Sequence, residues 1–167
     1  MTIREVITLP EPVLRRKARK VTDFGQDLQT LIDDMVETLR QAPGVGLAAP
    51  QVNIPLRVIV VEFGDEDDEE VPPKLYTVVN PEITRFSEES ETAAEACLSI
   101  PGYAGDVNRS FGITVKGVNR RGQPMRIKAN GWLARIFQHE IDHLDGILFI
   151  DRAERVWKQE GEAVVAD

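Results

Sequence analysis

The chain has a single cysteine, only two histidines and no long hydrophobic stretch, and these scarcities exclude whole classes of protein. Cys97 has no partner for an internal disulfide, which favours a reducing compartment. No apolar run approaches the roughly 20 residues that a membrane-spanning helix needs. The N-terminal stretch lacks the apolar core and cleavage site of a signal peptide, and no transit peptide is visible. These absences predict a cytoplasmic protein that does not bind a membrane.

Positive charge is also scarce, because 20 Lys and Arg residues stand against 28 Asp and Glu residues, for a formal net charge of -8. Such a chain is poorly suited to binding nucleic acids or anionic membranes through a broad basic surface. We therefore expect no direct sequence-specific binding of nucleic acid. The 167 residues, 42% of them hydrophobic, suffice for one globular domain with an adequate core.

Hydrophobic patterning predicts a helix early in the chain, several strands in the middle and a second helix near the end. Residues 27–40 carry apolar side chains at helical spacing, which predicts an amphipathic helix with one buried face. The predicted strands are the apolar runs 56–63, 75–80, 111–118 and 124–129. The second helix begins after Asn130 as its N-cap and ends near Gly146.

This order lacks a regular alternation of strand and helix. It predicts an α+β fold, with mostly antiparallel sheets packed around the central C-terminal helix. We expect residues 1–152 to form a single catalytic domain and residues 153–167 a short polar tail containing at most a short helix. Residues 44–51, rich in glycine and alanine, predict a loop whose backbone can lie close to a ligand. The acidic segment 64–70 is expected to be a solvated loop.

The late helix contains an H-E-x-x-H pattern, formed by His139, Glu140 and His143, and its two histidines are the only ones in the chain. Residues four apart lie on one face of a helix, so both imidazoles can bind one metal ion with the carboxylate beside them. The pattern alone leaves open the alternative of two ordinary core or solvated histidines.

A catalytic metal site of this kind needs a third protein ligand and an open position for water. The third histidine of H-E-x-x-H-x-x-G-x-x-H proteases is absent, because Phe149 occupies its place. Glu154 and Glu160 are available carboxylates, but they lie in the weakly patterned tail. Cys97 is the better candidate, because it lies among small residues and a thiolate is a strong ligand for a borderline cation.

Three separated motifs give the chain its resemblance to the peptide deformylase family. Residues 44–51 match the family motif G-Φ-G-L-A-A-x-Q, where Φ is an apolar residue. Residues 95–99 match the family motif E-G-C-L-S with one exception. Q-H-E-x-D-H-L matches residues 138–144. The motifs occur in the family's order, and the resemblance covers roughly residues 1–152. The exception is Ala96 in place of glycine, whose methyl group could crowd the substrate cleft or strain a backbone with positive φ.

The resemblance implies a hydrolase that removes the formyl group from the N-terminal formyl-methionine of nascent polypeptides and releases formate. It implies that Cys97, His139 and His143 bind one divalent metal ion, ferrous iron first, with zinc, nickel or cobalt as replacements. The ion lowers the pKa of its bound water, and the resulting hydroxide attacks the formyl carbon while Glu140 acts as general acid and base.

The resemblance also implies roles in binding the substrate and its developing charge. The Gln51 side chain and the Leu98 backbone N–H would stabilise the oxyanion. Backbone groups of Val45 and Gly46 would bind the substrate peptide as an added strand. An apolar pocket for the methionine side chain is expected from Val45, Leu98, Trp132 and Ile136. All four residue types also suit an ordinary core.

We further expect an ion pair between Glu95 and Arg109 that braces the cysteine segment, and oxygen acceptors for the ligating histidines. The implied partners are formylated nascent peptides and the ribosome near its exit tunnel. One alternative function is a metallopeptidase, which shares the H-E-x-x-H pattern. The other, suggested by Ala96, is a non-catalytic relative that binds metal.

Overall fold

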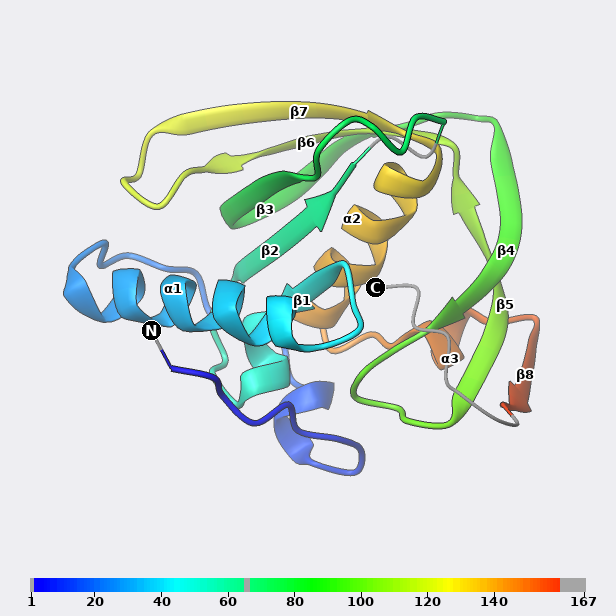
Figure 1. Cartoon of the computed structure of the whole chain (residues 1–167), viewed down its shortest axis with the longest axis horizontal. Helices are drawn as coiled ribbons and strands as arrows, with labels where there is room; N and C mark the ends of the chain where they lie inside the picture. Colours follow the sequence, from blue (N-terminus) through cyan, green and yellow to red (C-terminus); the bar gives the residue numbers. More distant parts are fainter. Residues whose placement is uncertain (1, 65–66, 160–167) are drawn as a thin grey trace.

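The computed structural model describes residues 2–64 and 67–159, which form two antiparallel sheets around one long helix (Figure 1). In chain order the elements are η1 (Pro12–Arg15), α1 (Gln26–Gln41), β1 (Gly46–Ala48), η2 (Ala49–Val52), β2 (Val58–Phe63), β3 (Lys74–Phe86), β4 (Ser90–Ala96), β5 (Tyr103–Ser110), β6 (Gly112–Val118), β7 (Pro124–Asn130), α2 (Gly131–Leu144), α3 (Phe149–Arg152) and β8 (Arg155–Lys158). The predicted mixture of helices with antiparallel sheets is confirmed. Within the described ranges, no helix combines the length and apolar character that crossing a membrane requires.

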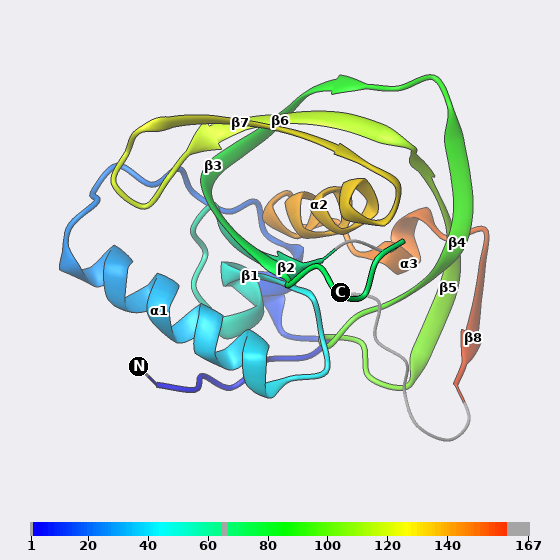
Figure 2. The ribbon, with the colours of Figure 1, turned by 45° about the horizontal axis from the view of Figure 1, so that its top comes forward.

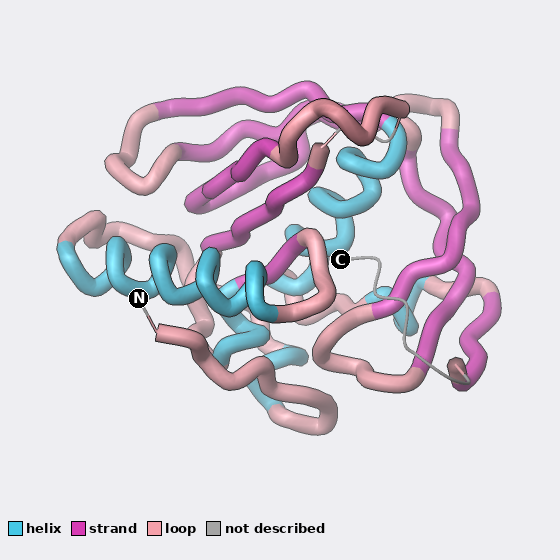
Figure 3. The backbone as a smooth tube through the Cα atoms, in the orientation of Figure 1, coloured by secondary structure: helices cyan, strands magenta, loops and turns pink. Residues whose placement is uncertain are grey.

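The larger sheet has the strand order β1-β2-β3-β6-β7, and the smaller sheet has the order β4-β5-β8. Figure 2 shows α2 enclosed by the curve of the two sheets, with α1 on the opposite side of β1 and β2. Two clusters of buried side chains match this arrangement. One joins α2 to the inner face of the large sheet, and the other joins α1 to β1 and β2. In the tube view, β4 and β5 run side by side as one long hairpin (Figure 3).

The apolar stripe of α1 explains why this helix packs against the sheet. Its members recur three and four residues apart, and each is at most 4% exposed: Leu28, Leu31, Ile32, Met35 and Leu39. Burial of one such side chain stabilises the fold by roughly 1.5–3 kcal/mol. This stripe is therefore a principal attachment of α1 to β1 and β2.

The strands β4 and β5 are absent from the sequence prediction, and two further segments differ from it. Residues 44–51, expected to be a loop, contain β1 and the first three residues of η2, and β1 pairs with β2. Residues 155–158, in the expected polar tail, form the strand β8 on β5 instead of a helix. Strands β1 and β8 are too short to show a periodicity, and their neighbours in the sheet determine their structure. Residues 65–66 of the acidic segment and 160–167 of the tail lie outside the described residues.

The C-terminal end of α2 requires a glycine. Asn130 is the N-cap residue at the other end, although its side chain makes no capping hydrogen bond. Just beyond α2, Gly146 has a φ of 73°, a left-handed conformation that suits glycine after a helix. A Cβ atom there would lie 2.5 Å from the carbonyl oxygen of Arg15. The C-terminal end of η1 therefore packs on the end of α2 without room for a side chain.

Gly146→Ala should lower the free energy of unfolding by more than about 2 kcal/mol, because the left-handed backbone and the contact with Arg15 both oppose a side chain. Gly102→Ala is the matched control, since Gly102 has a φ of 85° but a Cβ there would meet nothing within 4 Å. It should cost only about 1–2 kcal/mol. Urea unfolding of both variants measures the difference. Equal losses would contradict tight packing at Arg15.

Candidate metal centre

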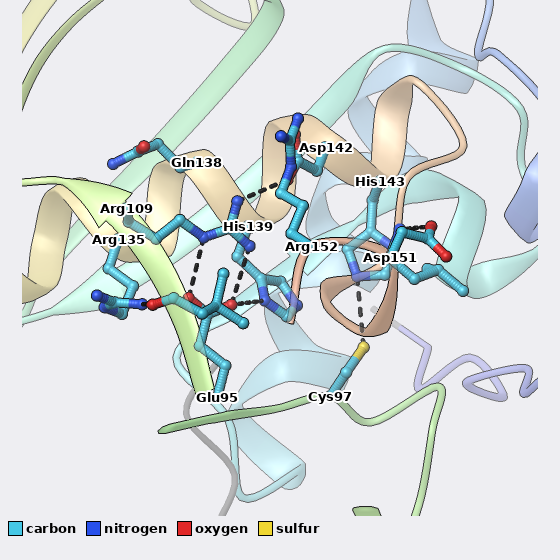
Figure 4. Close-up of polar contacts among 12 residues, drawn as sticks. Glu95, Cys97, Arg109, Arg135, Gln138, His139, Asp142, His143, Asp151 and Arg152 are labelled. Atoms are coloured by element: carbon cyan, nitrogen blue, oxygen red, sulfur yellow. Dashed lines mark hydrogen bonds and ion pairs between the residues drawn. The ribbon is translucent and has the colours of Figure 1, made fainter. Parts of the chain in front are cut away.

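Three side chains that can ligate a metal ion come together from distant parts of the sequence. Ligand atoms of Cys97, His139 and His143 all lie within 4.8 Å of one another, and each residue is at most 3% exposed. The Nε2 atom of His143 lies 3.4 Å from the Sγ atom of Cys97 (Figure 4). α2 supplies both histidines, and the turn after β4 supplies the cysteine. The fold thus brings together the three residues that the sequence predicts as metal ligands.

The chemistry of these donors fits one divalent cation. Thiolate and imidazole are suitable ligands for iron, cobalt, nickel and zinc. Burial is the main cause that lowers the pKa of His143 well below its ordinary value of 6.5, and the electrostatic effects of His139 and Arg109 act in the same direction. The His143 imidazole is therefore neutral near pH 7 and keeps a lone pair for a metal ion. Three protein ligands leave room in the coordination shell for water or substrate.

A buried carboxylate orients the first histidine. The Nδ1 atom of His139 lies 3.0 Å from Oε1 of Glu95, which is 1% exposed. Because Nδ1 is engaged with this carboxylate, Nε2 is the nitrogen that would bind a metal ion. Glu95 is thus the oxygen acceptor that the sequence predicts for a ligating histidine.

Two arginines converge on Glu95 (Figure 4). Arg109 donates from Nε and Nη2 to the two carboxylate oxygens, each at 2.9 Å, so the predicted ion pair is confirmed. Arg135 donates from Nη1 to Oε2 of Glu95 at 2.6 Å. Burial alone would raise the pKa of Glu95, but the hydrogen bonds and charges of His139 and Arg109 outweigh it and hold the pKa well below its usual range. Glu95 therefore remains ionised beside His139.

The ionic network continues to α3 through Asp142. Arg109 donates from Nη1 to Asp142 at 2.6 Å, and Arg152 donates to the same carboxylate at 2.7 and 3.0 Å. The sequence prediction missed Arg135 and Arg152. Arg135 precedes His139 by four residues, so a cation on the histidine face of the helix is a signal that could have found it. No comparable local signal marks Arg152.

Glu140 and Gln51 also lie in the interior, and neither is exposed to solvent. The Nε2 atom of Gln51 lies 3.6 Å from Sγ of Cys97 and 3.2 Å from Oγ of Ser99. The Ala48 N–H donates to Oε1 of Gln51 at 3.0 Å, which fixes the orientation of the amide. The N–H groups of Gln51 consequently point toward the cysteine segment.

The residues expected to line a methionine pocket are divided between two clusters of the core, the one around α2 and the one around α1. Ile136 is 1% exposed, and Val45 and Trp132 pack against the same cluster around α2. Leu98 packs against the cluster around α1. Trp132 also lines a cavity of about 230 Å³ that none of the three metal-ligand candidates lines. The pocket therefore stays a prediction.

Ala96 continues β4 and pairs with Ala104 of β5. Within residues 2–64 and 67–159, the non-glycine residues with a positive φ are Asn53 and Asn80. Ala96 is not one of them, so alanine at this position does not strain the backbone. The backbone accordingly provides no support for a loss of activity through Ala96.

Comparison with known proteins identifies the family. The sequence profile of the family described as polypeptide deformylase matches residues 3–159. The peptide deformylase of Natranaerobius thermophilus is 49% identical over 160 residues, which cover 96% of this chain and 98% of that protein. The structure is similar to the crystal structure of peptide deformylase from Thermotoga maritima, with a TM-score of 0.85, 40% identity and coverage of 93% and 100% of the two chains. A Met-Ala-Ser-bound peptide deformylase from Acinetobacter baumannii gives a TM-score of 0.83 and 37% identity, with coverage of 90% and 98%. The chain therefore belongs to the polypeptide deformylase family.

Proposed function

We propose that this chain is a metal-dependent peptide deformylase, which removes the formyl group from the N-terminal formyl-methionine of nascent polypeptides and releases formate. The observation that carries this proposal is the buried set of Cys97, His139 and His143, with Glu140 on the same helix. The similarity to peptide deformylases along nearly the whole chain supports it. No observation favours a metallopeptidase or a non-catalytic metal-binding relative.

Cys97, His139 and His143 would hold one divalent ion, which would supply Lewis acidity to water and to the formyl carbonyl. We assign ferrous iron first, with zinc, nickel or cobalt as replacements, because thiolate and imidazole donors suit all four. Glu140 acts first as general base, taking a proton from the attacking water. It then acts as general acid and delivers that proton to the leaving amine nitrogen.

Charge that develops on the formyl oxygen needs hydrogen-bond donors, and we assign this role to Gln51 and Leu98. The oriented amide N–H groups of Gln51 point toward the cysteine segment. Within the described part of the chain, the Leu98 N–H donates to no protein acceptor, which leaves it available to substrate. Loss of one such donor typically raises the barrier by about 3 kcal/mol.

The substrate peptide is assigned to the outer edge of β1, which is the edge strand of the larger sheet. The Val45 C=O already accepts a hydrogen bond from the Glu62 N–H at 2.9 Å. Backbone groups point alternately to the two sides of a strand, so those of Gly46 face the open edge. Recognition of main chain by Gly46 suits an enzyme whose substrates differ in sequence. The methionine pocket is assigned to the side chains of Val45, Leu98, Trp132 and Ile136.

On this proposal, the enzyme works in the cytoplasm near the ribosomal exit tunnel, where formylated chains emerge. The net charge of -8 gives the chain no overall electrostatic attraction to RNA. We assign the catalytic domain to residues 1–152, to which β8 from the tail 153–167 adds an edge strand.

Metal-loaded protein should convert formyl-Met-Ala-Ser to Met-Ala-Ser plus formate and leave unformylated Met-Ala-Ser intact. Mass spectrometry of the peptide and a formate assay measure the two products. A chelator should abolish turnover, and added ferrous iron under anaerobic conditions should restore it. Cleavage of the unformylated peptide would instead indicate a metallopeptidase. Tight metal binding without turnover of either peptide would indicate a non-catalytic relative.

A further inference from the structure

Gly46 on β1 lies directly against the side chain of Glu140 on α2. A Cβ atom built on Gly46 would lie 2.6 Å from Oε2, 2.9 Å from Cγ and 3.0 Å from Cδ of Glu140. Non-bonded carbon atoms pack best at about 3.5–4.0 Å. A side chain at position 46 would therefore compete with the Glu140 carboxylate for the same space.

The alternation of side chains along β1 explains this contact. Leu47 packs in the cluster around α1, whereas Ala48 packs in the cluster around α2. Gly46 lies two residues before Ala48 and faces the same side of the sheet. β1 thus presents only glycine and alanine to α2. This close approach of helix and strand leaves Glu140 with no exposed surface.

The glycine is not required by its backbone conformation. Among the described residues, the glycines with a positive φ are Gly102, Gly122, Gly131 and Gly146. Gly46 is not among them, and it pairs with Val61 in the regular ladder of β1 and β2. An alanine could adopt this backbone, and the three atoms nearest to its methyl group would all belong to Glu140. Space for that side chain is therefore the reason for glycine at this position.

We infer that Gly46 is a positioning residue for the reaction, an inference that rests on the proposed deformylase function. Its missing side chain leaves the slot in which the Glu140 carboxylate rests between β1 and α2. This role is separate from the recognition of substrate main chain, because alanine retains the same backbone N–H and C=O groups. Substitution by alanine consequently tests the slot alone.

Gly46→Ala should displace the Glu140 carboxylate and lower kcat by about 100-fold, the loss typical of a misplaced catalytic group. The KM for formyl-Met-Ala-Ser should change less than about threefold, because the backbone groups that bind peptide remain. Metal content should stay at that of the native protein. A rise in KM with unchanged kcat, or full activity, would overturn the inference.

The Glu140→Ala variant is the matched background in which to test Gly46→Ala. It lacks the side-chain atoms that the methyl group at position 46 would meet. In metal-loaded protein, Gly46→Ala should lower the Tm by about 2–4 °C in the native background and leave it unchanged in the Glu140→Ala background. In the Glu140→Ala background, Gly46→Ala should also cause no further loss of kcat. Equal losses in both backgrounds would overturn the inference. If native protein releases no formate, the proposed function fails, but the thermal comparison still decides whether the slot exists.

Discussion

Glu140→Gln should lower kcat for formyl-Met-Ala-Ser by about 10²–10⁴-fold while the protein retains its metal ion. Glutamine has nearly the shape of glutamate, so it fills the buried space between α2 and β1. Its amide does not take up the proton of the attacking water, and the leaving amine is then not protonated. The loss therefore measures proton transfer separately from packing and from metal binding.

Formate release and metal content should be measured on the same metal-loaded sample. Glu88→Gln is the control, because Glu88 is an exposed carboxylate in the segment before β4 and its replacement should not alter kcat. Turnover within about threefold of native would exclude Glu140 as the proton carrier.

The parts of this structure that follow from the sequence are those with a local periodic pattern. The apolar residues of α1 recur at helical spacing and are buried as predicted, and the runs that become β2 and β6 are β-branched. β4 is different, because its residues Ser90–Ala96 are mostly polar or small. Its strand conformation depends on pairing with β5, which no pattern within β4 records.

The same distinction applies to the candidate metal centre. The spacing of His139 and His143 on one helix is local, and the family motif points to Cys97. The ionic network joins β4, β5, α2 and α3, so only the folded chain shows which charges meet. Arg135 and Arg152 belong to this network, yet the sequence does not show which carboxylates they meet. Sequence predicts the ligands more readily than the groups that orient them.

Glu95→Gln should weaken both the fold and the metal site. Removing the charge leaves Arg135 without its carboxylate partner and Arg109 with Asp142 alone. Breaking a buried ion pair from one side typically lowers the free energy of unfolding by about 3–5 kcal/mol. The variant also loses the anionic acceptor that orients His139, so metal affinity should fall by about 10–100-fold.

The stability of the metal-free protein should also respond differently to acid. The pKa of Glu95 lies below its ordinary value of 4.5 in the fold, so its ionisation stabilises the folded state. That contribution is complete above about pH 4.5 and is lost as the pH falls through the lowered pKa of the folded state. Between about pH 5 and about pH 3, the unfolding free energy of Glu95→Gln should therefore depend less on pH than that of the native protein.

Glu91→Gln is the matched control, because Glu91 lies on the same strand with an exposed side chain. Its variant should retain native stability and metal affinity, since the nearby arginine uses only the backbone carbonyl of Glu91. Urea unfolding at each pH and competition with a metal chelator measure the two effects. If Glu95→Gln binds metal as tightly as the native protein although it unfolds more easily, the packing of α2 alone orients His139. A joint loss of stability and affinity would instead show that Glu95, through its arginines, sets the geometry of the metal ligand.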